Sequence, residues 1–265
     1  MNIDGRAIAA EIFHEVKGII RARNYHPHMT VFTCEPNIET QQFLKIKKKK
    51  AQDVGVDVNV VELLNLVTTE DVIASIKGFI PHTDGIVVQL PFPKHIDIDA
   101  VIEAIPTTHD VDALRIDTDS VIPPVVGAIA EILSRAGIAI AQKNVVVVGN
   151  GRLVGRPAAV WCRARGGHVT VVTEADSSSL EKVTRLADIL ITGAGKHGLI
   201  IPEHVKEGVV ILDAGTSEDA GEVKGDVDPQ CALKAALFTP VPGGIGPITV
   251  AVLFKNLMTL ATHAK

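Results

Sequence analysis

Aromatic side chains and cysteines are scarce in this sequence. Phe, Trp and Tyr make up 3% of the 265 residues, so we expect cores built from Val, Ile, Leu and Ala. The three cysteines, Cys34, Cys162 and Cys231, stand far apart and form neither a pair nor a cluster of metal ligands. An odd number of isolated cysteines is typical of reduced thiols in a cytosol, so we expect no disulfide framework and no metal site.

Strong charge and long apolar segments are also lacking. The net charge of −5 gives no electrostatic reason to expect nucleic acid or an anionic membrane as a partner. The N-terminus has neither the basic segment nor the apolar run of a secretion signal. No run approaches the roughly 20 apolar residues that span a bilayer. We therefore expect a soluble, cytoplasmic protein.

Short apolar runs alternate with longer helical patterns along the chain. This alternation predicts an α/β fold with parallel sheets wrapped by helices, and the run VVVV predicts a strand buried on both faces. The length suits two domains. We expect one domain from residues 1–121 with a C-terminal helix within 247–265, and a second, Rossmann-type doubly wound domain from residues 122–246. Strands are expected at 29–34, 58–63, 85–90, 144–149, 168–173, 188–192 and 209–213, and helices at 40–54, 69–80, 124–136, 156–164 and 180–185.

A glycine-rich turn follows one of the expected buried strands. The sequence VVVVGNGRLVGRP places Gly149 and Gly151 just after the strand and Gly155 near the start of a helix. Small residues there let the backbone approach a pyrophosphate, while the helix N-terminus offers unpaired N–H groups to the anion. The G-x-G-x-x-x-G spacing is one residue longer than the common fingerprint, and such a segment is often only a turn. The strand before it and the helix after it favour a dinucleotide site.

Acidic residues follow the next expected strand. An acid at this position typically accepts hydrogen bonds from the adenosine ribose and repels a 2′-phosphate. The alternative is a solvated acidic loop, the usual fate of such residues. Given the glycine turn, we expect the ribose ligand to be Glu174, with Asp176 as the second candidate.

Several segments, in this order, resemble the bifunctional methylenetetrahydrofolate dehydrogenase/cyclohydrolase family. They are IDGRAIAAEI at the start, VVQLPFP, DVDAL, VVVVGNGRLVGRP, GDVDP and TPVPGGIGPITVAVL near the end. The resemblance implies two α/β domains flanking a cleft, with folate on the first domain and a nicotinamide cofactor, NAD or NADP, on the second. It also implies a homodimer that oxidises 5,10-methylenetetrahydrofolate and hydrolyses the methenyl product to 10-formyltetrahydrofolate.

The resemblance also implies a folate site in the first domain. Lys47 matches the catalytic lysine of the family, Phe43 stands where the family has a tyrosine four residues earlier, and Lys50 lies near the same helical face. A lysine that is partly neutral can take a proton from water, and burial beside a cationic folate favours that form. Gln89 matches the residue that positions the amine, and Asp112 matches the carboxylate that binds the N–H groups of the pterin ring.

Further contacts follow from the same resemblance. The expected substrate-binding residues also include Val88, Leu90, Pro242, Gly243, Gly244, Pro247 and Thr249. The expected cofactor-binding residues also include Asn150, Arg152, Gly193, Gly195 and Thr216.

The sequence departs from the family pattern in places. Phe43 lacks the hydroxyl of the family's tyrosine, and the loop EPNIETQQF is about two residues longer than usual, which bears on hydrolysis more than on substrate binding. At the expected domain boundary Val125 and Val126 replace a Thr-Pro pair.

The cofactor turn departs from the pattern as well. Asn150 replaces an arginine that would neutralise the 2′-phosphate of NADP, and Ala175 and Asp176 stand where a serine and a basic residue are common. These changes predict NAD rather than NADP, although Arg152 and Arg156 could reach back and reverse the preference.

Two alternatives to a bifunctional enzyme remain open. One is a dehydrogenase that has lost its hydrolytic step together with the tyrosine, and the other is a protein that binds folate or dinucleotide without turnover. Retention of Lys47, Gln89 and Asp112 argues against the second. Another kind of two-domain dehydrogenase would share the architecture but not the PGGIGP and VQLP segments.

Overall fold

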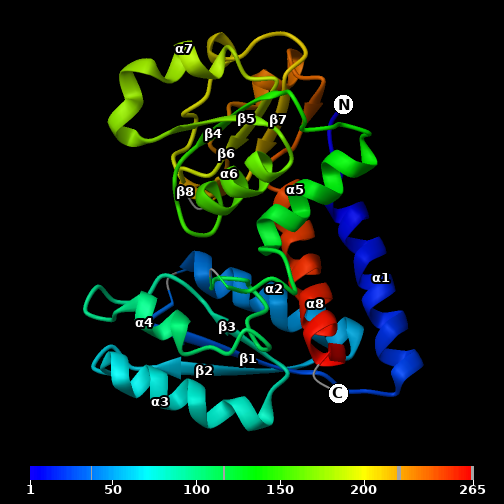
Figure 1. Cartoon of the computed structure of the whole chain (residues 1–265), viewed down its shortest axis with the longest axis vertical. Coiled ribbons are helices and arrows are strands. Elements are labelled where there is room, and N and C mark those ends of the chain that lie inside the picture. Colours follow the sequence, from blue (N-terminus) through cyan, green and yellow to red (C-terminus); the bar gives the residue numbers. More distant parts are fainter. Residues whose placement is uncertain (37, 116, 220–221, 264–265) are drawn as a thin grey trace. The chain divides into compact units, whose positions relative to one another are not determined.

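The protein is described by a computed structural model that covers residues 1–265 except 37, 116, 220–221 and 264–265 (Figure 1). The chain divides into two compact units, each built around a parallel β-sheet. The three-stranded unit contains Ala10–Pro124 and Val250–Lys265, and the five-stranded unit contains Met1–Ala9 and Val125–Thr249. The predicted α/β class with parallel sheets is therefore confirmed.

The sheet of the three-stranded unit has the strand order β2-β1-β3, all parallel. Six of the seven residues of β1 are buried, because β1 is central and has helices on both sides. One face carries an apolar cluster around Phe32 and Ile86, onto which Val72 and Ile76 of α3 pack. The strands are β1 (His28–Cys34), β2 (Asp57–Leu63) and β3 (Gly85–Val88), and the helices are α2 (Ile38–Val54), α3 (Thr69–Phe79), η1 (Ile80–His82) and α4 (Ile98–Glu103).

Two long helices, α1 (Gly5–Arg23) and α8 (Ile245–His263), also contribute to this unit. The rings of Phe13 and Phe254 lie 5.8 Å apart between their centroids. The side-chain amide of Asn256, which is 4% exposed, donates to the carbonyls of Val111 and Ile122 at 2.8 Å each. The C-terminal helix is thus tied to the segments that follow β3.

Helix α8 corrects one expectation about the sequence. Its segment Ile245–Thr262 is long and apolar enough, by length and composition, to cross a bilayer, although we expected no segment of that kind. In the structure 67% of this segment is buried inside the protein. That burial is the pattern of a core helix.

The sheet of the five-stranded unit has the order β10-β7-β6-β4-β5, again all parallel. The chain passes from β4 to β5 on one side and then returns to build β6, β7 and β10 on the other, so the order reverses between β4 and β6. The strands are β4 (Asn144–Val148), β5 (His168–Val172), β6 (Ile189–Thr192), β7 (Val210–Asp213) and β10 (Leu237–Phe238), and the helices are α5 (Pro124–Arg135), α6 (Gly155–Ala164), η2 (Glu174–Ser179), α7 (Leu180–Thr184), η3 (Pro202–His204) and η4 (Pro229–Leu233).

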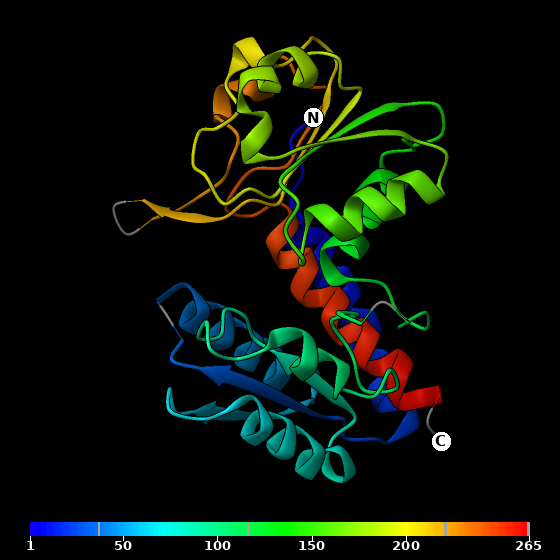
Figure 2. The same cartoon turned by 60° about the vertical axis from the view of Figure 1, so that its left-hand side comes forward.

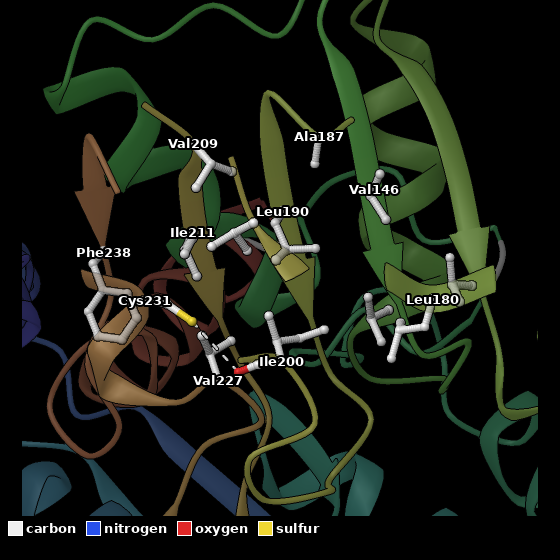
Figure 3. Close-up of a cluster of buried hydrophobic side chains, with 13 residues drawn as sticks. Val146, Leu180, Ala187, Leu190, Ile200, Val209, Ile211, Val227, Cys231 and Phe238 are labelled. Atoms are coloured by element: carbon white, nitrogen blue, oxygen red, sulfur yellow. Dashed lines mark hydrogen bonds between the residues drawn. The ribbon is translucent and has the colours of Figure 1, made fainter. Parts of the chain in front are cut away.

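One face of this sheet carries an aliphatic core (Figure 3). Val146, Leu190 and Ile211, from three neighbouring strands, point into it together with Ile200 and Phe238. The composition, rich in aliphatic and poor in aromatic residues, is the one we expected from the sequence. A separate hairpin, β8 (Ser217–Asp219) with β9 (Glu222–Lys224), extends outside the sheet (Figure 2).

The first residues of the chain lie in the five-stranded unit, whereas we expected them in the first domain. Asn2 forms a bridge with Phe238, and the N–H of Ile3 donates to the carbonyl of Phe238 at 2.9 Å. These backbone hydrogen bonds extend the sheet beside β10. They explain why Met1–Ala9 group with this unit.

Candidate active site

Helix α2 brings Lys47 to the carboxyl end of β3. The ammonium of Lys47 donates a hydrogen bond of 2.7 Å to Oε1 of Gln89, which lies directly after the strand. The Lys47 side chain is partly buried. Burial lowers the pKa of its amine, and the nearby carboxylate of Asp112 partly opposes that shift. The structure thus brings together the three side chains that we expected to form the catalytic group.

The other lysines of the run have different surroundings. Lys50 lies with its Nζ 5.4 Å from the centroid of the Phe13 ring and 3.7 Å from the carboxylate of Asp53. The exposed Lys45, Lys48 and Lys49 line an open cavity of about 480 Å³ between α2 and β2. Of the lysines in this run, Lys47 is the one for which the described contacts include a hydrogen bond to Gln89. The helical register therefore separates Lys47 from Lys50, which spacing alone could not do.

Gln89 is held from both ends. Its backbone N–H donates to the carbonyl of Phe32 at 2.8 Å, which continues the β1–β3 ladder by one residue. Its side-chain amide donates to the carbonyl of Leu90 at 3.4 Å, which leaves Oε1 to accept from Lys47. Val88, which is 3% exposed, and the half-buried Leu90 belong to the apolar cluster of this unit. The side chain of Val88 therefore lies in the core and that of Leu90 packs against it, and their contact with substrate stays a prediction.

Asp112 lies in the segment that runs beside β3, where Asp110 bridges to Ile86. Burial raises the pKa of Asp112 to about 6; Lys47 opposes the shift and Asp110 adds to it. Asp110 is fully buried, and its Oδ2 accepts from the backbone N–H of Arg115 and the hydroxyl of Thr118 at 2.9 Å each. The pKa values of the amine and the carboxyl are thus shifted toward each other. Such a pair is typical of sites that move protons.

The glycine turn of the five-stranded unit depends on close packing of its backbone. Gly149 follows β4 with φ +100°, and a Cβ there would lie 2.6 Å from the carbonyl oxygen of Gly193. A Cβ on Gly155, the first residue of α6, would overlap the carbonyl of Gly149. Val154, which precedes α6, provides no side-chain cap for the first N–H groups of the helix. The N–H of Arg156 donates to the carbonyl of Gly151 at 3.0 Å and Pro157 has no N–H, so the donor that the first turn of α6 can offer to an anion is the N–H of Gly155.

The acids after β5 have different roles. The carboxylate of Asp176 accepts from the N–H and the hydroxyl of Thr173 at 2.9 and 2.7 Å, and these hydrogen bonds lower its pKa. Asp176, the second candidate for the ribose, is therefore engaged in its own turn. Glu174 is exposed at the tip of the strand. Asn150 is exposed in the glycine turn.

The remaining predicted cofactor residues belong to the glycine turn or adjoin it. Gly193 follows β6 and lies against Gly149. A Cβ on Gly195 would lie 3.5 Å from the carbonyl oxygen of Thr216. These residues gather at the reversal of strand order between β4 and β6, which is where open α/β sheets bind ligands. Arg152 is half-buried.

The PGGIGP segment lies against the N-terminal segment of the chain. The N–H of Gly5 donates to the carbonyl of Gly243 at 2.9 Å, and the N–H of Gly244 donates to the carbonyl of Pro240 at 2.7 Å. Pro242 is exposed, Pro247 is half-buried in the first turn of α8, and the Thr249 hydroxyl donates to the carbonyl of Ile245 at 3.1 Å. The side chain of Phe43 lies outside the described part of the structure.

Sequence reasoning overlooked Asp213 and Asp226, two acids buried next to Gly193. Asp213 is 1% exposed and Asp226 is 0% exposed. Asp226 belongs to the GDVDP segment, which we noted only for its resemblance to the family. Its position between apolar and glycine residues was the available signal for a buried acid.

The fold and the site define a class of protein: a two-unit α/β protein with a dinucleotide turn in one unit and a lysine–glutamine–aspartate group in the other. The family model described as "Tetrahydrofolate dehydrogenase/cyclohydrolase, catalytic domain" matches residues 3–112. The model of the NAD(P)-binding domain of the same family matches residues 123–265. The chain therefore belongs to the tetrahydrofolate dehydrogenase/cyclohydrolase family, and the resemblance inferred from its motifs is confirmed.

Relatives match over nearly the full length of this chain. It is 38% identical to the bifunctional protein FolD of Halothermothrix orenii, with 96% of this chain and 95% of the relative covered. The crystal structure of the Trypanosoma brucei methylenetetrahydrofolate dehydrogenase-cyclohydrolase, complexed with NADP and an inhibitor, superposes with a TM-score of 0.93 at 32% identity and covers 100% of this chain and 98% of that one. The bifunctional enzyme FolD of Campylobacter jejuni superposes with a TM-score of 0.93 at 30% identity, covering 100% and 99% of the two chains.

Proposed function

We propose that this protein catalyses both reactions of its family. It oxidises 5,10-methylenetetrahydrofolate to the methenyl form by hydride transfer to a nicotinamide dinucleotide, and it hydrolyses the methenyl product to 10-formyltetrahydrofolate. The observation that carries the proposal is the Lys47–Gln89–Asp112 group, with its 2.7 Å hydrogen bond and its opposed pKa shifts. We infer that the enzyme acts as a homodimer in the cytoplasm.

In hydrolysis Lys47 serves as the general base. Its lowered pKa increases the fraction of neutral amine, and a cationic methenyl folate nearby would increase that fraction further. Oε1 of Gln89 can accept a hydrogen bond from an N–H of the amine whether Lys47 is neutral or charged, so this bond holds the nitrogen in place throughout. The lone pair of the neutral amine then takes a proton from the attacking water.

Asp112 binds the substrate. An ionised carboxylate can accept two N–H groups of an aminopyrimidine ring in a bidentate arrangement. With a pKa of about 6, Asp112 is mostly ionised at neutral pH. The two N–H groups of the ring would stabilise the ionised form further. In the free protein, burial of the Asp112 carboxylate is unfavourable, and hydrogen bonds from the bound ring offset that cost.

In oxidation the five-stranded unit holds the dinucleotide, whose nicotinamide ring accepts the hydride when it is bound. Gly149 and Gly155 allow the close backbone packing that shapes the turn, and the N–H of Gly155 at the start of α6 donates to the pyrophosphate. Glu174 accepts hydrogen bonds from the adenosine ribose. The backbone of the PGGIGP segment, from Pro242 to Pro247, contacts the folate substrate.

NAD is the preferred dinucleotide. Glu174 is exposed where a 2′-phosphate would lie, and Asn150 brings no positive charge. Repulsion between a phosphate and an exposed acid a few ångströms away amounts to about 1 kcal/mol, or roughly fivefold in affinity. Steady-state kinetics test this preference: kcat/KM should be higher with NAD, and a higher value with NADP would show that Arg152 and Arg156 reverse it.

The absorbance of the methenyl intermediate tests the two activities together. With methylenetetrahydrofolate and NAD, the purified protein should form the intermediate and then consume it faster than buffer alone. Accumulation without enzyme-dependent decay would indicate the monofunctional dehydrogenase, in which the change to Phe43 has abolished hydrolysis. Absence of any intermediate with either NAD or NADP would refute the proposed function.

A further inference from the structure

A fully buried carboxylate, Asp226, holds the turn that follows β6. Its Oδ2 accepts from the N–H of Ala194 at 2.6 Å, and its Oδ1 accepts from the N–H of Lys196 at 2.7 Å. The N–H of Gly195 between them also bonds to this carboxylate. Three successive backbone donors thus converge on one side chain. A concave group of N–H donors of this kind usually binds an anion, and here the anion is part of the protein.

This arrangement fixes which groups the turn can offer to a ligand. In a planar trans peptide the C=O points opposite to the N–H of the next residue. Because the N–H groups of residues 194–196 point to Asp226, the carbonyls of residues 193–195 point away from it. The Gly193 oxygen lies 2.6 Å from the position of a Cβ on Gly149, so the first of these carbonyls faces the glycine turn. Ala194 and Gly195 are exposed, so the backbone on the open side of the turn offers acceptors, while its N–H groups are engaged with Asp226.

A second buried carboxylate holds Asp226 in place. Asp213, at the end of β7, accepts from the N–H of Asp226 at 3.3 Å and from that of Val227 at 3.0 Å. It also accepts from the hydroxyl of Thr192, the last residue of β6, at 2.8 Å. A Cβ on Gly215 would overlap the Asp226 carboxylate. The turn is therefore connected rigidly to the ends of β6 and β7.

The sheet order indicates which half of a dinucleotide meets this turn. Glu174, the ribose acceptor for the adenosine half, follows β5, which lies on one side of β4. The turn at 193–196 follows β6, which lies on the other side of β4. A dinucleotide bound across the switch point spans both sides, with its pyrophosphate over the glycine turn. The half that meets the turn is then the nicotinamide ribose half, whose hydroxyl and amide groups are donors.

We propose that Asp226 is a positioning residue for the dinucleotide: it holds the 193–196 turn with its carbonyls outward, where they accept hydrogen bonds from the hydroxyl or amide donors of the nicotinamide half. This inference rests on the proposed dinucleotide site. It assigns to the backbone carbonyls of the turn a preference for ligand groups that donate hydrogen bonds.

The test compares Asp226→Asn with Asp228→Asn. Both variants change one carboxylate to an amide within the same segment, but Asp228 caps η4 through a 2.8 Å hydrogen bond from the N–H of Gln230. An amide can accept with one oxygen only, and its NH2 group would face the N–H groups of the turn. We expect NAD affinity, measured by titration calorimetry without folate, to fall about 10- to 100-fold in Asp226→Asn and to stay within about twofold in Asp228→Asn.

Hydrolysis of methenyltetrahydrofolate provides the internal control, because that reaction requires no dinucleotide. Asp226→Asn should retain the wild-type hydrolysis rate while KM for NAD rises. A parallel loss of hydrolysis and NAD binding would show a purely structural role and overturn the proposal. Unchanged NAD affinity in the folded variant would overturn it as well.

A second variant keeps the proposal testable if Asp226→Asn does not fold. Gly195→Ala places a Cβ at φ +65° in an exposed position, which disfavours the turn without disturbing the buried acids. It should weaken NAD binding and spare hydrolysis in the same way, and normal NAD binding in Gly195→Ala would count against the proposal. If the wild-type protein binds neither NAD nor NADP, the proposed function fails together with this inference; if it binds NAD and the variants bind equally well, only the inference fails.

Discussion

Replacing Lys47 by Met removes the amine and keeps most of the side chain. If Lys47 is the general base of hydrolysis, its loss lowers the rate by about 10²–10⁴, or roughly 3–5 kcal/mol of barrier. The effect on folding should be small. Oε1 of Gln89 loses a donor at 2.7 Å, which costs about 1–3 kcal/mol, but the protein no longer has to bury an ammonium.

Lys50→Met is the matched control, because it is the same change one helical turn further along α2. Lys50 contributes a pair with Asp53 at 3.7 Å, in which the two side chains are 43% and 54% exposed, and a cation–π contact of 5.4 Å with Phe13. Together these stabilise the fold by at most about 1 kcal/mol, which is roughly 2–4 °C in Tm. We expect hydrolysis by Lys50→Met to be close to that of the wild type. Loss of hydrolysis in Lys50→Met with retention in Lys47→Met would refute the assignment.

The pH dependence of hydrolysis tests the same reasoning. Because burial lowers the pKa of Lys47, its neutral amine forms at a lower pH than that of an ordinary lysine. The rate of hydrolysis should therefore rise with pH through the shifted pKa. Asp112 raises the pKa of Lys47, so Asp112→Asn should move the rising limb to lower pH when measured at saturating folate. In Lys47→Met the limb should disappear. A limb that persists there would identify another base.

Two further predictions concern stability and cofactor binding. Burial and the hydrogen bond to Asp84 raise the pKa of Tyr25, the single tyrosine, so the phenolate absorbance of the folded protein should appear only well above the ordinary pKa of about 10. Because the folded state favours the phenol, the contribution of Tyr25 to stability is complete below about pH 10 and is lost as the pH rises toward the shifted pKa. Titration of the folded protein at about pH 10 would contradict the contact with Asp84. Gly155→Ala forces a Cβ against the carbonyl of Gly149 and should weaken NAD binding, measured by titration, by about tenfold or more. In the control Gly18→Ala the added Cβ meets nothing within 4 Å, so NAD binding should be unchanged.

The sequence predicted the parallel sheets and the glycine turn because these depend on local patterns, whereas Lys47, Gln89 and Asp112 were expected from the resemblance to the family. Val88, the last residue of β3, belongs to the apolar cluster, and Leu90 packs against it. The short helix α4 and the hairpin of β8 and β9 were not predicted, since elements of three to six residues have little periodicity to detect.

The role of Asp226 could not be predicted, because its partners are distant in the sequence. Ala194 and Lys196 precede it by 32 and 30 residues, and they bond through backbone groups that carry no residue-specific signal. The pairing of Met1–Ala9 with β10 has the same origin: Ile3 reaches Phe238 through main-chain hydrogen bonds alone. Contacts of this kind become visible only in three dimensions.

The groups assigned to the two reactions follow one rule of placement. Gln89, Gly149, Glu174 and Gly193 each come directly or almost directly after a parallel strand, where the backbone leaves the ladder and can face a ligand. Lys47 is the exception, since it reaches the end of β3 from the middle of a helix by virtue of its long side chain. Lys47, Gln89 and Asp112 lie in the three-stranded unit, and the glycine turn lies in the five-stranded unit. Because hydrolysis requires no dinucleotide, substitutions of Gly149 or Glu174 should impair oxidation and spare hydrolysis. A variant of either residue that abolished hydrolysis while the protein stayed folded would show that the two sets of groups do not act separately.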